Sequence, residues 1–123
     1  MDTVSITIPA SPRYLQVVRM VASGLASRLK FTIDEIDDLK IAVDELAAYL
    51  TGAHGRDGTL EVAFVVRDDG IAIRGAGKFP PGIKVRTELT EFSRQILDTV
   101  ADDATLESRD GVPTFALTKQ KRS

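Results

Sequence analysis

Several stretches of the chain carry hydrophobic residues at every second position, which is the pattern of β-strands with one buried face. The first stretch is Val4, Ile6 and Ile8, and Pro9 ends it. Further stretches run over residues 60–66 and 71–73, and residues 105–108 and 112–118 form a final pair. Asp-Gly pairs at positions 69–70 and 110–111 predict tight turns, so the later stretches should form two β-hairpins.

Elsewhere hydrophobic residues recur at intervals of three and four, which predicts three amphipathic helices. Ser11 and Pro12 mark the start of the first helix, because serine caps helices and proline is tolerated at their first position. Thr32 and Glu35 form a capping box at the start of the second. The expected buried stripes are Leu15, Val18, Ala22, Leu25 and Leu29; Ile36, Leu39, Val43, Leu46 and Leu50; and Leu89, Phe92, Ile96 and Val100.

Glycine and proline predict the loops. Residues 51–58 and 75–85 each carry several glycines, so both are expected loops, with Gly75-Ala76-Gly77 as a simple turn. Residues 119–123 are expected to form a frayed polar tail. The resulting order, βααββαββ, predicts an α+β two-layer sandwich with helices on one face of a mostly antiparallel sheet. No repeat or linker divides the chain, so we expect a single domain over residues 1–123.

Composition narrows the functional classes. The chain carries a net charge of -2, so nucleic acid is not the expected partner. It has no cysteine, and its one histidine, His54, is an expected solvated residue of a glycine-rich loop. The acidic residues of the run 34–38 do not have the ligand spacing of any metal-binding loop, so no metal site is predicted. Residues 17–29 are too polar to span a membrane and residues 1–8 are no signal peptide, so a cytoplasmic protein is expected.

Three segments carry a family resemblance, namely residues 8–14, residues 34–43 and Ala101-Asp102-Asp103. With the element order, they resemble the RsbW-type anti-sigma factors, which are serine-protein kinases of the histidine kinase and Hsp90-like ATPase superfamily. The resemblance implies that superfamily's fold and a homodimer. It also implies two partners, a sigma factor and a STAS-domain anti-anti-sigma protein. Such proteins phosphorylate the second partner on serine, using ATP and magnesium.

The resemblance implies a nucleotide site that starts on the second helix. Glu45 matches the family's catalytic base. Tyr49 stands where the family has an asparagine that holds magnesium, and a neutral phenol is a poor ligand for that ion. Glu45 has a second interpretation as a surface carboxylate beside Asp44. The family's other nucleotide-binding residues are also altered in this chain, as described next, so the surface carboxylate is the favoured interpretation.

The other implied parts of the nucleotide site are also altered. Gly75 stands at the position of the adenine-binding aspartate, and Gly77 at the glycine that follows it. Neither can accept a hydrogen bond through a side chain. The family's glycine-rich phosphate segment aligns with Thr90, Glu91, Phe92 and Ser93, where no glycine remains and Glu91 would repel phosphates.

The first helix holds the expected partner-binding residues. The resemblance implies that an arginine of this helix contacts the partner, and Arg19 is the best match, with Arg13 and Tyr14 nearby. An ordinary solvated helix face remains an open alternative for all three.

These observations favour an anti-sigma-type regulator that binds a sigma factor or a STAS-domain partner, with ATP binding lost or weakened and no cofactor expected. One alternative is an active serine/threonine kinase that uses Glu45, ATP and magnesium. Another is an adaptor or sensory domain of a stress-response signalling pathway.

Overall fold

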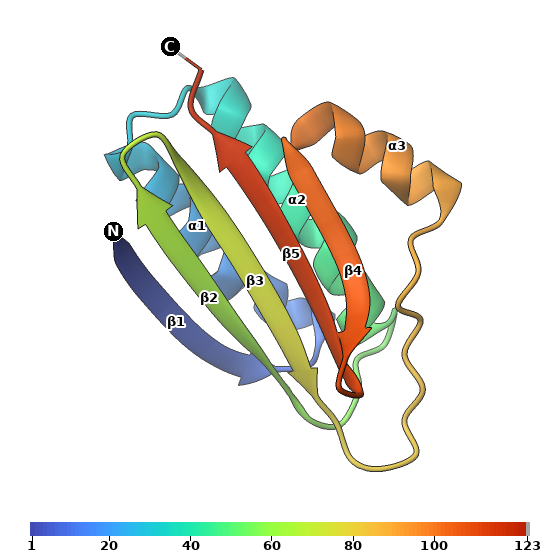
Figure 1. Ribbon diagram of the computed structural model, residues 1–123. Helices are drawn as coiled ribbons and strands as arrows, with labels where there is room; N and C mark the ends of the chain where they lie inside the picture. The colour runs from blue at the N-terminus through green and yellow to red at the C-terminus, as the bar shows by residue number, and fades with distance from the viewer. Residues whose placement is uncertain (123) are drawn as a thin grey trace.

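The computed structural model describes residues 1–122, and its centre is a five-stranded antiparallel sheet (Figure 1). The strands are β1 (Asp2–Pro9), β2 (Thr59–Arg67), β3 (Gly70–Lys78), β4 (Asp103–Arg109) and β5 (Val112–Gln120). They lie in the order β1-β2-β3-β5-β4. Both predicted hairpins are therefore confirmed, and the pairing of β3 with β5 joins them.

Helices cover one face of this sheet, and within residues 1–122 no helix covers the other (Figure 1). They are α1 (Leu15–Arg28), α2 (Ile33–Thr51) and α3 (Glu91–Val100), and a short 3-10 turn, Pro12–Tyr14, precedes α1. α2 lies between α1 and α3 and contacts both. The predicted element order and the two-layer α+β architecture are confirmed.

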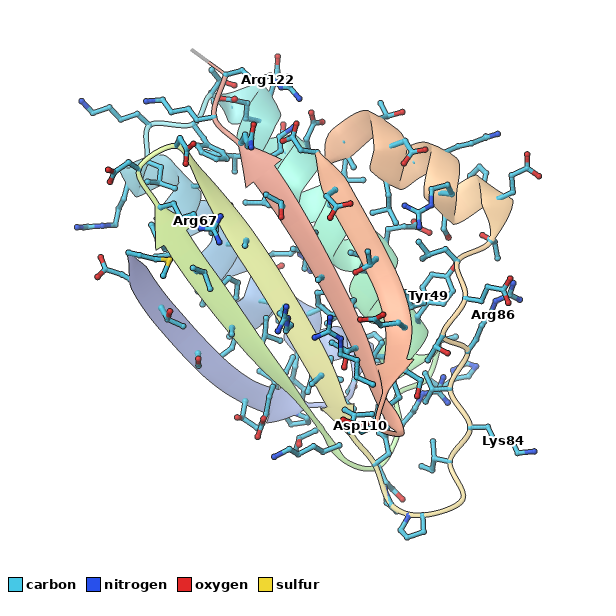
Figure 2. The ribbon with its side chains drawn as sticks, in the orientation of Figure 1. Tyr49, Arg67, Lys84, Arg86, Asp110 and Arg122 are labelled. Carbon is cyan, nitrogen blue, oxygen red and sulfur yellow. The ribbon has the colours of Figure 1, made fainter. Side chains whose placement is uncertain are left out.

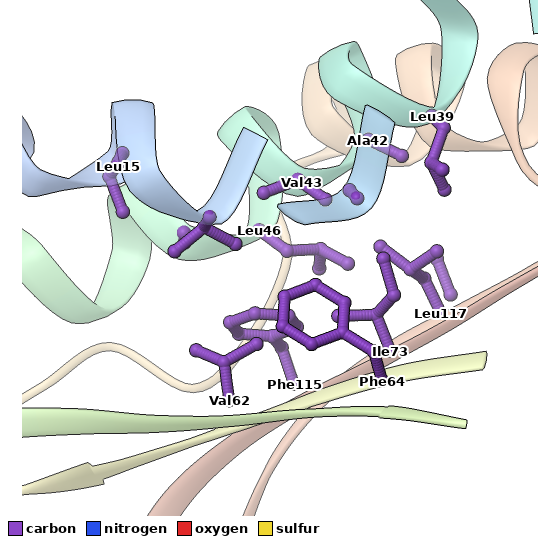
Figure 3. Close-up of a cluster of buried hydrophobic side chains, with 14 of the residues drawn as sticks. Leu15, Leu39, Ala42, Val43, Leu46, Val62, Phe64, Ile73, Phe115 and Leu117 are labelled. Atoms are coloured by element: carbon purple, nitrogen blue, oxygen red, sulfur yellow. The ribbon is translucent and has the colours of Figure 1, made fainter. Parts of the chain in front are cut away.

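The core forms where inward-facing strand residues meet the apolar faces of the helices (Figure 3). Phe64 on β2, Ile73 on β3 and Phe115 on β5 are almost completely buried. They face α2, where Leu39 and Leu46 are also fully buried. Burying each large apolar side chain stabilises the fold by about 1.5–3 kcal/mol, so this layer fixes α2 on the sheet.

The N-terminus of α2 has the capping box that the sequence predicts. Thr32 Oγ1 accepts a hydrogen bond from Glu35 N at 3.1 Å, and Glu35 Oε1 accepts one from Thr32 N at 2.8 Å. Glu35 Oε2 accepts a further bond from Arg122 N at 2.7 Å, which ties the chain after β5 to the start of α2. The backbone donors of Thr32 and Arg122 lower the pKa of Glu35, although burial acts in the opposite direction.

Two predicted details of the helices are wrong. Ser11 and Pro12 begin the 3-10 turn, and Ser11 makes no side-chain cap, so the α-helix itself begins only at Leu15. Phe92 was expected in the buried stripe of the third helix but is 71% exposed. Thr90 caps that helix, and the rotation that follows turns the polar Ser93 inward instead.

The predicted loop over residues 75–85 is also partly wrong. β3 continues through Gly75 and Gly77 to Lys78, so Gly75-Ala76-Gly77 is extended strand and not a turn. Both glycines are buried on the face that the helices cover. Their small size serves close packing within the sheet and not a change of chain direction.

The predicted polar tail is ordered where the structure describes it. Lys119 and Gln120 complete β5, while Ser123 lies outside the described residues. Lys119 is 4% exposed, and its Nζ donates to Val100 O at 3.0 Å and lies 3.5 Å from Asp38 Oδ2. A cation at the C-terminal end of a helix is favourable, so this lysine anchors β5 beneath α3.

We expect Glu35→Gln to flatten the acid limb of the protein's stability profile. Since the folded-state pKa of Glu35 is lowered, its ionised form contributes stability that is fully present above the unfolded-state pKa, about 4.3. That contribution is lost as the pH falls through the folded-state pKa. Glutamine has one acceptor oxygen in place of two, so the variant loses a bond to Thr32 N or Arg122 N.

Urea unfolding of both proteins from neutral to acidic pH measures this effect. The difference between their free energies of unfolding should shrink as the pH falls. A difference that stays constant with pH would contradict the role assigned to the carboxylate.

Candidate functional site

Four side chains of the candidate nucleotide site meet between α2 and the start of α3. The Tyr49 hydroxyl lies 2.6 Å from Ser93 Oγ and accepts a hydrogen bond from Thr90 N at 3.1 Å. Ser93 Oγ in turn donates to Glu45 Oε2 at 2.6 Å. We call Glu45, Tyr49, Thr90 and Ser93 the α2–α3 hydroxyl network.

Local helix geometry explains why these residues meet. Glu45 and Tyr49 are four positions apart on α2, so they lie on one face of it. Thr90 is the N-cap of α3, and its Oγ1 accepts a hydrogen bond from Ser93 N at 3.0 Å, which satisfies one free donor of the first turn. The cap therefore places the Ser93 hydroxyl opposite the polar face of α2.

Glu45 is half-buried and hydrogen-bonded, and so differs from the solvated carboxylate that the sequence favours. A carboxylate that accepts a bond from a serine hydroxyl has the geometry of a general base and its substrate. Here the hydroxyl belongs to Ser93, which is 4% exposed. The contact thus resembles that of a catalytic base with a substrate hydroxyl, except that both groups belong to the same chain.

The Tyr49 hydroxyl is engaged entirely by protein groups. Burial disfavours the phenolate, but hydrogen bonds to Ser93 and Thr90 outweigh burial, so the pKa of Tyr49 is lower than its ordinary value. In Figure 2 Tyr49 extends from α2 toward the segment that leads into α3. The side chain therefore bridges α2 and the start of α3.

The two glycines of β3 lie under aromatic rings. Gly75 pairs with Phe115 of β5, and a Cβ added at position 75 would overlap the Phe115 ring. A Cβ added at Gly77 would overlap the ring of Phe79. An aspartate at position 75 would fit only if the buried Phe115 moved, so the ring occupies the volume that such a side chain needs.

Residues 79–90 connect β3 to α3 and end at the α2–α3 hydroxyl network. Exposure alternates along this segment: Ile83, Val85 and Leu89 are half-buried, whereas Lys84 and Arg86 are exposed. Figure 2 shows Lys84 and Arg86 on its solvent side. The segment therefore turns an apolar side to the protein and charged residues, Lys84, Arg86 and Glu88, to solvent. Glu91, the first residue of α3, is exposed beside it.

The expected partner-binding residues differ in how they are held. Arg13 and Tyr14 are exposed in the 3-10 turn. Arg19 is less free, because its Nη1 lies 2.7 Å from Asp44 Oδ1 and its Nη2 donates to Gln16 Oε1 at 2.7 Å. Contacts to both α1 and α2 therefore orient its guanidinium.

Arg19 also lines a groove between α1 and α2. Met20 and Ile41 line the same groove and are 62% and 45% exposed, which is high for apolar side chains. Arginine beside exposed apolar groups is the composition of a protein-binding surface.

Sequence reasoning did not single out Phe79, Phe115 or Asp44, although each contacts a site residue. The glycines inside a strand were a signal for the two rings, since such glycines mark close approach. Nothing in the sequence marked the pairing of Asp44 with Arg19.

Residues 1–122 contain neither a metal-binding cluster nor a membrane-spanning helix. No cluster of three or more histidine, aspartate or glutamate side chains there is arranged to hold a metal ion. No helix in that range is long and apolar enough to cross a membrane.

We expect Tyr49→Phe to destabilise the protein by about 1–3 kcal/mol, because the change leaves Thr90 N without its acceptor and removes one hydrogen bond of Ser93 Oγ, which keeps its bond to Glu45. Tyr14→Phe is the matched control, since Tyr14 is exposed and should tolerate the change. Chemical unfolding of both variants gives the comparison. Equal stability of the two would mean that the Tyr49 hydroxyl does not hold α3.

Comparisons with known proteins show which family the chain belongs to. No family model matches the chain. The chain is 32% identical to the serine-protein kinase RsbW of Bacillus pumilus (strain SAFR-032) over 139 aligned positions, which cover 96% of this chain and 85% of that protein. It is also 32% identical to the serine-protein kinase RsbW of Bacillus subtilis (strain 168), with the same coverage. The 139 positions exceed the 123 residues of this chain, so the B. pumilus protein contains residues with no counterpart here.

The fold has a counterpart among solved structures. The structure of the RsbU and RsbW domains of Rv1364c from Mycobacterium tuberculosis matches 99% of this chain and 33% of that chain, with a TM-score of 0.69 and 16% identity. At that identity the match concerns the fold. The relatives from Bacillus, at 32% identity over 85% of their length, show that this chain belongs to the RsbW family of serine-protein kinases.

Proposed function

We propose that this protein is an RsbW-type anti-sigma regulator that acts by binding partner proteins, and that its nucleotide binding is lost or much weakened. The partners are a sigma factor, a STAS-domain anti-anti-sigma protein, or both. Membership of the RsbW family supports the first part of the proposal. The α2–α3 hydroxyl network is the observation that carries the second.

The network supports weakened nucleotide binding through the chemistry of Tyr49. Magnesium prefers carboxylate, amide or water oxygens that can approach it closely. The Tyr49 hydroxyl is instead bonded to Ser93 and Thr90. A phosphate at the start of α3 would have to displace these contacts and would also meet the Glu45 carboxylate.

The rings over β3 support weakened recognition of adenine. Specific recognition of a base needs a polar group in a pocket that matches the base. At positions 75 and 77 the chain has glycines covered by Phe115 and Phe79. These rings pack against backbone and offer no hydrogen-bond partner.

The partner surface follows from the groove between α1 and α2. Arg19 is held there by Asp44, beside the exposed Met20 and Ile41. An oriented arginine loses less conformational entropy on binding than a free one, which favours affinity. We therefore assign this groove, together with Arg13 and Tyr14, to partner binding.

The alternative function is a working serine kinase with a divergent site, and the short contact between Glu45 and Ser93 favours it. In that reaction Glu45 would accept the proton of a serine on the partner, and ATP with magnesium would supply the phosphoryl group. Ser93 and Tyr49 would first have to rotate away from Glu45. For the adaptor alternative, the M. tuberculosis structure contains an RsbU domain beside its RsbW domain, so a domain of this fold can be part of a larger chain.

We expect ATP with magnesium at millimolar concentration to leave the melting temperature unchanged. A ligand present at 100 times its dissociation constant stabilises a protein by about 2.7 kcal/mol, which shifts the melting temperature by several degrees in a domain of this size. The RsbW of B. subtilis, measured in parallel, serves as the reference. A shift with ATP but not with sulfate would favour the kinase alternative.

We expect Arg19→Ala to weaken binding to a sigma factor or STAS-domain partner by at least about 1 kcal/mol, because arginine often dominates interface energies. The loss of stability should stay below about 1 kcal/mol, the usual limit for a partly exposed ion pair such as Arg19 with Asp44. Titration of a partner recovered by pull-down gives the affinity. Arg28→Ala is the control, since Arg28 is exposed at the end of the same helix. Equal affinity of all three proteins would remove Arg19 from the interface.

A further inference from the structure

The two edges of the sheet differ in how they are protected from pairing with another strand. β4 forms one edge, and its exposed side chains include the charged residues Asp103, Glu107 and Arg109. Arg94 of α3 also donates from its Nη1 to Ala104 O of this strand at 2.9 Å. Charged side chains and covering groups of this kind ordinarily prevent an edge strand from accepting a further strand.

β1 forms the other edge and has no such protection. Residues 3–8 read Thr-Val-Ser-Ile-Thr-Ile and carry no charge. β1 pairs with β2 in one continuous register from Asp2 to Pro9, without a bulge that would twist the edge away. A long, regular and uncharged edge of this kind is a template for strand pairing.

The register shows which backbone groups of β1 point outward. Ala10 N donates to Gly58 O at 3.1 Å, and this pair continues the register of β1 with β2. Hydrogen-bonded and non-bonded pairs alternate along an antiparallel ladder. The even-numbered residues of β1 therefore bond to β2, whereas Thr3, Ser5 and Thr7 turn their N–H and C=O groups to the free edge. Within residues 1–122, no backbone bond outside the strand pairing uses these groups.

Apolar side chains line the same margin of the sandwich. α1 contacts β2 whereas α2 contacts β5, so the side of α1 away from α2 faces the β1 edge (Figure 1). Val17, Val21 and Leu25 recur at intervals of four on that side, opposite the groove that α1 forms with α2. Val17 is 40% exposed, and Val21 and Leu25 are half-buried. On β1, Val4 is 36% exposed and Ile6 is half-buried, so the core is only partly covered here.

We propose that the free edge of β1 binds an extended segment of a partner protein, which adds to the sheet as a sixth strand antiparallel to β1. The backbone of the segment exchanges hydrogen bonds with Thr3, Ser5 and Thr7. Every second side chain of the segment lies beside Val4 and Ile6 and under the rim of α1, so these side chains are apolar. In strand addition of this kind, backbone bonds supply affinity and alternate side chains supply specificity.

The size of the edge favours a single segment over a second copy of this chain. β1 has eight residues, which at about 3.3 Å per residue gives an edge of roughly 26 Å, and packed layers lie about 10 Å apart. Two copies joined along this edge would bury roughly 500 Å² in total, about half of what a stable protein interface needs. A single strand fits along the full edge and suits a weak, reversible contact. This contact is independent of the nucleotide site and of the groove between α1 and α2.

Two synthetic peptides with fluorescent labels test the proposal. In both, threonine and valine alternate over seven residues, and a lysine at each end provides solubility. One peptide carries N-methyl groups on its valines and the other on its threonines. Residues paired directly across two strands share a face, so the threonines of a bound peptide lie opposite Thr3, Ser5 and Thr7 and turn their N–H groups to β1. We expect fluorescence anisotropy to show binding of the valine-methylated peptide, and binding at least about tenfold weaker for the threonine-methylated one, which lacks these donors.

A variant of the edge gives a second readout. Ser5→Pro removes the central outward N–H, and proline is tolerated on an edge strand where that group is not used within the sheet. We expect this variant to bind the valine-methylated peptide at least about tenfold more weakly than the wild type does. Thr105→Ala, on the opposite edge strand, should bind it as the wild type does. Melting curves confirm that both variants are folded.

Amide hydrogen exchange in the wild-type chain locates the contact without any substitution. Saturation with the valine-methylated peptide should slow exchange at Thr3, Ser5 and Thr7 and leave the amides of β4 unchanged. Equal affinity for the two peptides, or no binding of either at millimolar concentration, would overturn the proposal. Slow exchange at these three amides in the absence of peptide would also overturn it, because the edge would then already be paired, for example with a second copy.

Discussion

The hydrogen bonds that run from Tyr49 through Ser93 to Glu45 determine how α3 sits against α2, and the character of the candidate site follows from them. Partly buried oxygen atoms need partners, and an oxygen left without one costs about 1–3 kcal/mol. In this network each polar atom satisfies another, so the junction is stable without a bound molecule. The segment 79–90 ends at Thr90, and the same bonds therefore hold its last residue in place.

Under the proposed loss of nucleotide binding, the residues at the altered positions should be accompanied by side chains that fill the space. A void in a core costs stability in proportion to its volume, so a lost ligand site is stable only when other side chains occupy it. The Phe115 ring fills the space above Gly75, and the Tyr49 hydroxyl is hydrogen-bonded to the hydroxyls of Ser93 and Thr90. For the same reason, an aspartate at position 75 would be incompatible with Phe115, and an asparagine at position 49 would leave Ser93 short of a partner. Under the same proposal, restoring a nucleotide site would require several simultaneous substitutions.

The sequence predicted those parts of the fold that depend on local periodicity, and missed those that depend on pairing at long range. The capping box of Thr32 and Glu35 and the turns at Asp-Gly pairs are short-range features, and all were predicted correctly. The glycines of β3 were assigned to a turn because their meaning depends on Phe115, forty residues later in the chain. Glu45 was favoured as a surface carboxylate for the same reason, since its partner is on another helix. Phe92 was assigned to the core on hydrophobicity alone, whereas the cap at Thr90 set the rotation of α3.

The groove proposed for partner binding and the candidate nucleotide site lie at different places in the helical layer. The groove of Arg19 lies between α1 and α2, and the α2–α3 hydroxyl network lies between α2 and α3. Both involve α2, which packs on a core of almost fully buried side chains, including Phe64, Ile73 and Leu46. Closely packed interiors deform little, so communication between two sites needs an element with two discrete arrangements. In the kinase alternative, the segment 79–90 would be such an element, with nucleotide controlling it. Under the proposed loss of nucleotide binding, that control would be absent, and we expect partner binding to be independent of ATP in this protein.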